Sequence, residues 1–407
     1  MYMVNSGRFT VGERLEMSRR RRGLSRKVVA ELVGRSEEWL RTVETGRRRL
    51  DSIETITRLA RVLDIADPGE LVDRPPWSKE KGHRGIAELA VLRRAVIDHP
   101  ALRVYHRQQD FEQIDPEWAA AALRLCNRAW ASSPRRYSVL AQHLPRTLTA
   151  SRLIRWQRRD AATAGLLIWA YHLARRLATA SGDHRLAAVV ADRAMGTSAQ
   201  VHNRALVAAS AWHLSHAFAG LGHPQEAHDY ALSAAGRLGG GSAADTEQRT
   251  LWGALHLVAA RAAIGARDPA ESARLLGLAE RVAAESTTDT FAFGIPFGPV
   301  QFGTTRVEIA LDCNDPAQAL RLAAEVEIPD DYPIGYQVRH HIHLACAYCA
   351  RDDEVATAFM LNKATAISPE DVRHHAGAQR CLRYLRDCDN PLIRPEVTKL
   401  SDLVYAR

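Results

Sequence analysis

Regularly spaced turn segments are the feature that most constrains the fold of this chain. Five short segments rich in Gly, Asp and Pro interrupt an Ala- and Leu-rich stretch, at residues 181–185, 221–225, 266–270, 313–317 and 350–354. The intervals are 40, 45, 47 and 37 residues between successive markers, which are Asp183, His223, Asp268, Asp315 and Asp352. Apolar and small residues recur at helical spacing on both sides of each turn. The pattern predicts a series of hairpins, each made of two amphipathic helices, and no strands.

Small residues mark the places where the two helices of a hairpin are expected to touch. Residues 211–238 and 305–326 both contain a small-residue helix, a Gly/Asp/Pro turn and a helix with an x-A-x-x-x-A pattern. Repeats of somewhat more than 34 residues with this layout resemble tetratricopeptide repeats with lengthened loops. The resemblance implies an all-α superhelix over about residues 86–403, and a generic helical bundle is the alternative.

The first 66 residues predict a separate small helical domain. Ser25 and Ser36 are good N-caps for a second and a third helix, which follow a first helix that ends near residue 22. Gly34 lies in the short turn between them, where a positive φ is expected, and Ala30 is small enough for a close crossing. Two helices joined in this way form a helix-turn-helix unit.

Apolar spacing predicts the core of this domain. The positions expected to face inward are Val11, Leu15, Val28, Val29, Leu32, Leu40, Val43, Ile53, Ile56, Leu59, Ala60 and Leu63. Asp51 and Glu54 fit a capping box at the start of the last helix.

Positive charge is concentrated in the same segment. Residues 1–66 hold 15 Lys/Arg and 9 Asp/Glu, whereas the remaining 341 residues hold 40 and 38. A small basic module on a nearly neutral body is typical of a nucleic-acid-binding domain. A solvated basic face is the alternative interpretation.

The order of residues in this segment resembles the Cro and lambda-repressor type of helix-turn-helix, the Xre-like family, over residues 9–66. The positions that carry the resemblance are Leu15, Arg19, Gly23, Leu24, Ser25, Ala30, Glu31, Leu32, Gly34, Ser36, Leu40, Val43, Glu44, Gly46, Arg47 and Arg48. The resemblance implies that the third helix enters the major groove of duplex DNA. It assigns to base edges and the groove wall Ser36, Glu37, Glu38, Trp39, Arg41 and Thr42. It assigns to phosphates Arg26, Lys27, Arg47, Arg48 and Arg49.

Side-chain chemistry refines these roles. Arg41 can donate to O6 and N7 of guanine, and Glu37 or Glu38 can accept from N4 of cytosine. The two glutamates have a second interpretation, because acidic residues stabilise the first turn of a helix. The family often has Gln where this chain has Arg26, which leaves a base contact there open.

The layout of the whole chain resembles actinobacterial regulators of the Xre type with a tetratricopeptide body, some of which sense small peptides in the concave face. Residues 67–85 are rich in Pro, Gly and charged residues, which predicts a connector between two domains. The expected domains are 9–66 for DNA binding, 67–85 as the linker, and 86–403 as the sensor and dimerisation domain.

The densest aromatic segment of the chain suggests where an effector binds. Phe residues alternate with Gly and Pro over residues 291–303. One hypothesis is a loop that lines the concave ligand site, and the alternative is a loop that fills the superhelix with its own rings. The predicted ligand-binding residues are Phe293, Phe297, Gln301, His213 and Arg306.

Other chemistry is weakly supported. On a helix, His340, His343, Cys346 and Cys349 spread over half the circumference, so they predict core and groove positions instead of a metal site. The sequence contains no phosphate-binding Gly loop, G-x-S-x-G or H-E-x-x-H motif. We therefore expect no enzyme activity, no cofactor and no metal. The absence of long apolar runs and of a signal peptide predicts no membrane span and a cytoplasmic protein.

These observations lead to one main hypothesis and one alternative. The main hypothesis is a homodimeric transcriptional regulator that reads a pseudo-palindromic operator in double-stranded DNA and is controlled by a small-molecule or peptide effector. The alternative is a scaffold whose repeats dock another regulator, with weak or no specific DNA binding. The acidic start of the third helix favours the alternative, and the concentrated positive charge opposes it.

Overall fold

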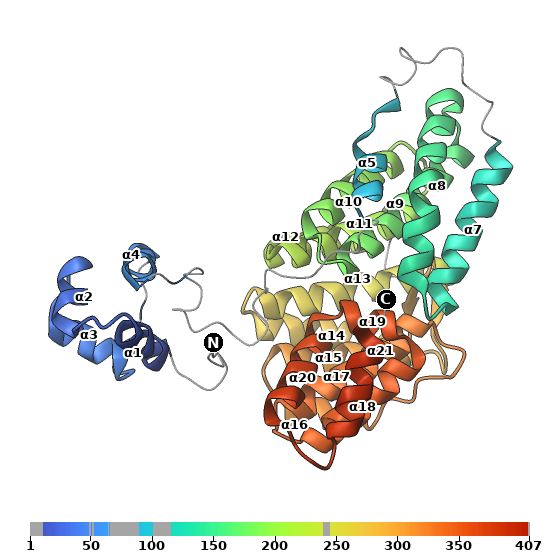
Figure 1. Ribbon diagram of the computed structural model, residues 1–407. Helices are drawn as coiled ribbons and strands as arrows, with labels where there is room; N and C mark the ends of the chain where they lie inside the picture. The colour runs from blue at the N-terminus through green and yellow to red at the C-terminus, as the bar shows by residue number, and fades with distance from the viewer. Residues whose placement is uncertain are drawn as a thin grey trace. The chain divides into compact units, whose positions relative to one another are not determined.

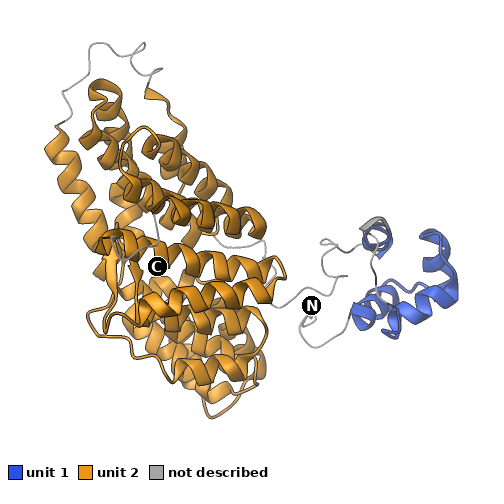
Figure 2. Ribbon diagram, turned by 180° about the vertical axis from the view of Figure 1, so that it is seen from behind, with its two compact units in different colours: residues 1–81 blue, residues 82–407 orange. Residues whose placement is uncertain are grey.

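The computed structural model describes residues 11–48, 50, 53–63, 65, 89–100, 115–238 and 245–405. The chain divides into two compact units, Met1–Lys81 and Gly82–Arg407 (Figure 2). We describe each unit by itself. The predicted linker over 67–85, Arg49 and the predicted capping box of Asp51 and Glu54 lie outside the described residues and side chains.

The first unit contains four described helices. They are α1 (Val11–Arg21), α2 (Arg26–Leu32), α3 (Glu37–Glu44) and α4 (Ile53–Leu63). One apolar cluster joins all four, and it includes Leu15, Val29, Leu40 and Leu59, none of which has accessible surface. The predicted burial of Leu40, Val43, Ile56 and Leu63 is confirmed.

The predicted inner face of α2 is partly wrong. Val28 is 40% exposed and Leu32 is 59% exposed, whereas Val29, Ala30 and Val33 are buried. Residues i and i+4 share a face of a helix. The face that carries Val29 and Val33 points into the core, so the face that carries Val28 and Leu32 points away from it. The buried face is the one that has small Ala30 beside it, because α2 packs closely against α3 and α4.

The second unit is a succession of helices (Figure 1), which confirms the predicted all-α class. The helices are α5 (Leu89–Ile97), α7 (Pro116–Ser132), α8 (Arg136–Arg158), α9 (Ala161–Ala180), α10 (His184–Ser198), α11 (Arg204–Leu221), α12 (Pro224–Leu238), α13 (Thr246–Gly265), α14 (Pro269–Ala283), α15 (Pro299–Asp312), α16 (Pro316–Ala323), α17 (Ile334–Cys349), α18 (Glu354–Ile367), α19 (Pro369–His374), α20 (Ala376–Cys388) and α21 (Arg394–Tyr405). None of the described helices is long and apolar enough to cross a membrane.

All five predicted turns join two helices, and their local chemistry is repeated. In each turn a residue with left-handed φ precedes the first residue of the next helix by two positions. These residues are Gly182, Gly222, Arg267, Asn314 and Asp352, with φ between 58° and 87°. In four turns the side chain of the following Asp accepts a hydrogen bond from a backbone N–H in the first turn of the next helix. These N-caps are Asp183, Asp268, Asp315 and Asp353. The turns are therefore encoded locally.

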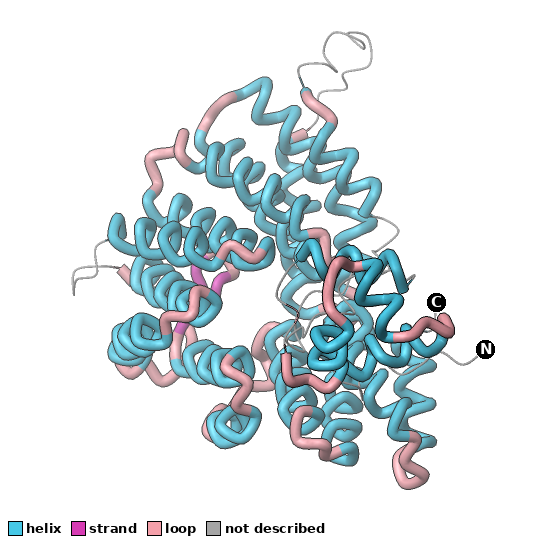
Figure 3. Tube along the Cα trace, turned by 90° about the vertical axis from the view of Figure 1, so that its left-hand side faces the viewer, coloured by secondary structure: helices cyan, strands magenta, loops and turns pink. Residues whose placement is uncertain are grey.

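The hairpins form two layers. Helices α9, α11, α13, α15 and α17 contact one another in succession and form the inner layer. Helices α10, α12, α14 and α16 each pack mainly between the helix before and the helix after in the chain, and they form the outer layer. Figure 3 shows the successive hairpins following a curved path.

The two ends of this path are in contact. α7 packs against α17, and residues at the start of α8 bind α19. Arg136 forms a buried ion pair with Asp371, whose carboxylate also accepts from the hydroxyl of Tyr137 at 2.8 Å. The backbone N–H of Tyr137 donates to Glu370 at 2.9 Å. We refer to Arg136, Tyr137, Glu370 and Asp371 as the closure contact.

A β-hairpin interrupts the helical pattern and was not predicted. Strands β1 (Thr290–Ala292) and β2 (Ile295–Phe297) pair in antiparallel register over Phe291 and Pro296. Phe293 and Gly294 form the two-residue turn, with φ of 50° and 69°, as a type I′ turn requires. The strands pack on α13. The tip reaches α9, where the ring of Phe293 lies 6.0 Å from that of Trp169.

Candidate functional site

The two central helices of the first unit are positioned by their caps. The Ser25 hydroxyl accepts from the backbone N–H of Val28 at 3.2 Å, and the Ser36 hydroxyl accepts from that of Trp39 at 3.1 Å. Gly34 has a φ of 71° and reverses the chain between α2 and α3. The predicted helix–turn–helix geometry is therefore present, and α3 begins at Glu37.

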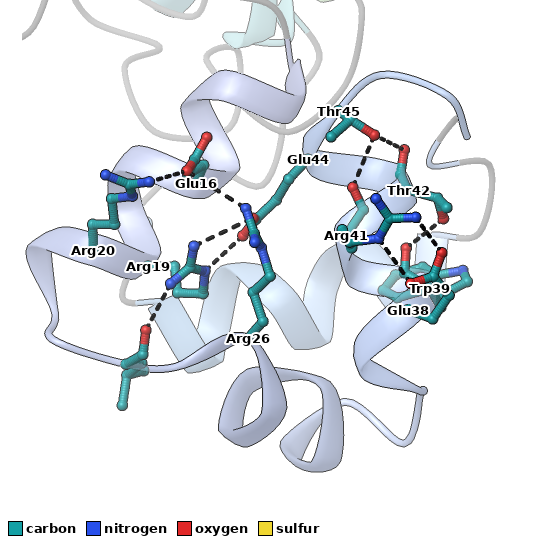
Figure 4. A network of polar contacts seen from close by, with 11 residues as sticks. Glu16, Arg19, Arg20, Arg26, Glu38, Trp39, Arg41, Thr42, Glu44 and Thr45 are labelled. Atoms are coloured by element: carbon teal, nitrogen blue, oxygen red, sulfur yellow. Dashed lines mark hydrogen bonds and ion pairs between the residues drawn. The ribbon is translucent and has the colours of Figure 1, made fainter.

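A buried carboxylate fixes α3 against the other helices (Figure 4). Glu44 has a fully buried side chain and accepts from Arg19 Nε on α1 at 2.6 Å and from Arg26 Nε on α2 at 2.6 Å. Arg19 also donates to the backbone oxygen of Leu24 at 2.9 Å. Arg19 and Glu44 carry the family resemblance, but no separate role was predicted for either of them. The sequence signal for Glu44 is its place next to the core residue Val43. The signal for Arg19 is its place four residues after the core residue Leu15.

Close backbone packing adds to this restraint. A Cβ at Gly12 would lie 2.3 Å from the backbone oxygen of Glu44. The start of α1 therefore touches the end of α3, and only glycine leaves space for the contact. α3 is held at its last turn by both backbone and side-chain contacts, which leaves its outer face free to meet a partner.

The first unit is similar to a known family of domains. Residues 10–74 match a family model described as helix-turn-helix domain. The first unit is a helix-turn-helix domain. No curated protein matches the chain.

Three solved structures show distant similarity to between 61% and 91% of this chain. BtubC (BKLC) from P. vanneervenii is 12% identical, with a TM-score of 0.37 over 61% of this chain and 90% of that one. PlcR of Bacillus thuringiensis, in complex with the peptide PapR7 and DNA, is 12% identical, with a TM-score of 0.33 over 91% and 98%. The apo form of the competence regulator ComR from Streptococcus vestibularis is 11% identical, with a TM-score of 0.28 over 88% and 97%. Similarity this distant assigns neither a family nor a function to this chain.

The residues assigned to base reading lie on the outer face of α3 in the helix-turn-helix domain. Ser36, Glu37, Glu38 and Arg41 are exposed, and Trp39 and Thr42 are partly buried. Thr42 donates to the backbone oxygen of Trp39 at 2.7 Å, and the Arg35 guanidinium lies 5.6 Å from the Trp39 ring. Trp39 packs against the apolar core, so it positions the start of α3.

Arg41 has an acidic partner on its own helix. Its Nε and Nη2 donate to the two carboxylate oxygens of Glu38 at 2.8 and 2.6 Å (Figure 4). The hydrogen bonds from Arg41 lower the pKa of Glu38, and those to Glu38 raise the pKa of Arg41. Both side chains are largely exposed, so the pair contributes little to stability and can exchange for another partner.

The residues assigned to phosphates fall into two groups. Lys27, Arg47 and Arg48 are exposed, and their side chains pair with no carboxylate among the residues the structure describes. Arg26 is bound to Glu44 and also lies 3.6 Å from Glu16, with 33% of its side chain exposed. Arg26 therefore serves the packing of the domain in this arrangement.

The predicted ligand residues of the body occupy different places. Phe297 is 4% exposed and lies against Gly253, where a Cβ would come within 2.1 Å of its ring. Arg306 lies 3.5 Å from Glu325, and Gln301 donates to Thr305 on the same helix. Phe293 and His213 both contact α9, through Trp169 and His172. The structure therefore brings two of the five residues to one helix.

The His and Cys residues of α17 belong mainly to packing. Cys346 Sγ lies 3.8 Å from Cys381 Sγ, and both contact the apolar cluster of the last helices. Burial lowers the pKa of His340 to about 4, which keeps this ring neutral at pH 7. Within the described ranges, no three His, Cys, Asp or Glu side chains are placed to hold a metal ion.

Proposed function

We propose that this chain is a homodimeric transcriptional regulator that binds operator DNA through α3 and responds to an effector bound by its helical body. The observation that carries the proposal is the face of α3. Ser36, Glu37, Glu38 and Arg41 are exposed there, while caps, core and the Glu44 ion pairs hold the other side of the helix. A helix of this kind fits the major groove, which is about 12 Å wide.

The basic residues around α3 support the same function. Lys27 lies at the start of α2, next to Arg26, which binds Glu44 in the last turn of α3. Arg47 and Arg48 follow α3, so exposed positive charge is present near the end of the candidate reading helix. Such residues attract phosphates without reading sequence. A dimer would place two copies of α3 about 34 Å apart, one turn of DNA, which explains a pseudo-palindromic operator.

The Glu38–Arg41 pair makes the proposal specific. Guanine O6 and N7 offer two acceptors to an arginine, as the carboxylate of Glu38 does. Binding of Arg41 to guanine therefore exchanges one bidentate partner for another. Glu38, once released, can accept from N4 of a neighbouring cytosine.

Fluorescence anisotropy of the full chain tests this function, with duplex DNA from upstream of its own gene and a scrambled duplex, across a salt series. We expect a preference of about 10³-fold or more for the native duplex. Arg41→Ala should weaken specific binding by about 5- to 150-fold, corresponding to about 1–3 kcal/mol. The matched control is Arg237→Ala on α12, an exposed arginine of the body, which should bind as the native chain does.

Equal and steeply salt-dependent binding to both duplexes would contradict sequence reading and leave phosphate attraction alone. The second candidate function, a scaffold that docks another regulator, would then be preferred. The exposed acidic start of α3 is the observation that favours it, because Glu37 and Glu38 repel phosphates. Light scattering gives the oligomeric state independently, and a monomeric mass would contradict the proposed homodimer.

A further inference from the structure

Two adjacent arginines on α9 meet no counter-charge among the residues that the structure describes. Arg175 and Arg176 are 5% and 9% exposed. Within the described part of the chain, no Asp or Glu lies within ion-pair distance of either guanidinium. A buried charge without a partner is costly, so proteins rarely keep one unless another molecule supplies the partner.

Three arginines on other helices of the body are paired with carboxylates. Arg136 is paired with Asp371, in the closure contact. Arg261 is paired with Glu308 and Asp312, and Arg339 with Glu308 at 3.3 Å. Among the described residues, Arg175 and Arg176 have no such carboxylate partner.

The hydrogen bonds of the two arginines leave most of their donors unused. Arg175 Nε donates to Nδ1 of His213 at 2.9 Å, and Arg176 Nη2 donates to the backbone oxygen of Gly294 at 2.8 Å. The two terminal nitrogens of Arg175 meet no acceptor among the described residues. Each guanidinium has five N–H donors, so most of them are open to a bound acceptor group or to solvent.

The histidines beside Arg175 add a second, independent observation. Because Nδ1 of His213 accepts a hydrogen bond and burial lowers the pKa of this ring well below its usual value, Nε2 carries the proton. That N–H is fully buried and has no partner among the described residues. The stacked ring of His172, 3.9 Å away, likewise has an unpartnered Nδ1. Unused polar atoms thus accumulate around Arg175.

Aromatic rings flank the arginines. The Arg175 guanidinium lies 5.4 Å from the ring of Trp212, and that of Arg176 lies 5.9 Å from the ring of Trp130. Arg339 on α17 is close enough to oppose the charge of both, and it keeps 37% of its side chain accessible. Tyr336 and Arg339 of α17 both act on the charges of Arg175 and Arg176, so the cluster lies on the side of α9 that is near α17.

We propose that Arg175 and Arg176 bind a small organic anion, through the oxygen atoms of a carboxylate or phosphate group. This inference rests on the proposed effector function of the body, and it names the chemistry of that effector. Guanidinium groups match the two acceptor oxygens of such an anion, and the indole rings of Trp130 and Trp212 offer flat surfaces for its organic part.

Binding to the full chain without DNA tests the inference. The probes are benzoate, phenyl phosphate and inorganic phosphate, with neutral benzamide as the matched control. We expect at least one anion to raise the Tm of the body and quench tryptophan fluorescence, and benzamide to do neither. Concentrations should reach about 10 mM, because a fragment-sized ligand binds with a Kd of about 1 mM.

Two variants and a control locate the site. Arg175→Gln and Arg176→Gln should each weaken anion binding by about tenfold or more, as the loss of hydrogen bonds to a charged group predicts. Without ligand, both variants should be as stable as the native chain or more so, because an uncompensated buried charge is removed. Arg274→Gln, which changes an exposed arginine of α14 paired with Glu271 at 2.6 Å, should bind as the native chain does.

The proposal is overturned if none of the three anions binds, if benzamide binds equally well, or if Arg274→Gln weakens binding while the two α9 variants do not. A lower Tm for both α9 variants without ligand would also overturn it, since the guanidinium groups would then be structural. The assay contains no DNA, so its failure is separate from failure of operator binding.

Discussion

Replacing Glu44 by Gln tests how the helix-turn-helix domain holds its candidate reading helix. The carboxylate has no accessible surface and accepts from Arg19 at 2.6 and 3.2 Å and from Arg26 at 2.6 Å. Removing one partner of a buried pair costs about 3–5 kcal/mol, because the other charge remains buried. Arg19 is only 7% exposed, so this range applies to it.

The size of the domain sets the observable effect. A domain of about 65 residues has a free energy of unfolding of about 3–10 kcal/mol. Each kcal/mol shifts its Tm by about 4–8 °C, so Glu44→Gln should lower the Tm of this domain by at least about 12 °C. Differential scanning calorimetry of the full chain measures this shift while the transition of the body stays in place. DNA affinity should fall with the folded fraction of the domain.

Arg26→Gln is the matched control. Arg26 is 33% exposed, and its replacement leaves the pair of Arg19 and Glu44 intact. The expected loss is about 1–2 kcal/mol, for one charged hydrogen bond that is partly solvated. Equal small shifts of a few degrees for Glu44→Gln and Arg26→Gln would refute the reasoning, because Glu44 would then compensate no buried charge.

Three further changes test the body. Asp371→Asn removes the partner of buried Arg136 and should lower the free energy of unfolding by about 3–5 kcal/mol in urea. Gly253→Ala places a Cβ 2.1 Å from the ring of Phe297, so this ring must leave its site; we expect a loss of about 2–4 kcal/mol by the same measurement. Arg267→Gly relieves a left-handed φ of 65° and should raise stability by about 1 kcal/mol, seen as a higher Tm.

Each of these changes has a control in the same unit. Tyr137→Phe removes only a hydroxyl from the closure contact, so a loss as large as that of Asp371→Asn would contradict the charge argument. Gly277→Ala meets no atom within 4 Å and should be neutral or stabilising; a loss like that of Gly253→Ala would show that any Cβ in these helices is harmful. Asn314→Gly relieves a similar φ of 60°, and a fall in Tm for both turn variants would refute the strain argument.

Local signals made the turns and helices predictable. A capping Asp and a left-handed residue act within a few positions of each other, as at Asp268 and Arg267, so the sequence shows them side by side. The face of α2 was harder, because Val28 and Val29 are both apolar and only the packing partners decide which is buried. The β-hairpin was missed because Phe293, a residue that rarely takes a positive φ, occupies its turn.

The candidate sites divide in the same way. The reading residues of α3 follow from their position after Ser36, and the structure adds only that Arg41 is bound by Glu38. The role of Glu44 and the closure contact depend on partners separated by 25 and more than 230 residues. No periodic pattern reports such pairs. That Arg175 meets no carboxylate among the described residues was equally hidden, since a sequence lists arginines but not their counter-ions.

The closure contact has a mechanical consequence for the body. An open stack of hairpins can flex at any junction independently, because nothing connects its ends. Here the ion pair between Arg136 and Asp371 connects α8 to α19. A rotation between two hairpins must therefore be compensated by rotations between other hairpins, or the closure contact must open. The helices of the body therefore form a closed loop. The helix–helix contact that opens most easily decides which movements a bound molecule can cause.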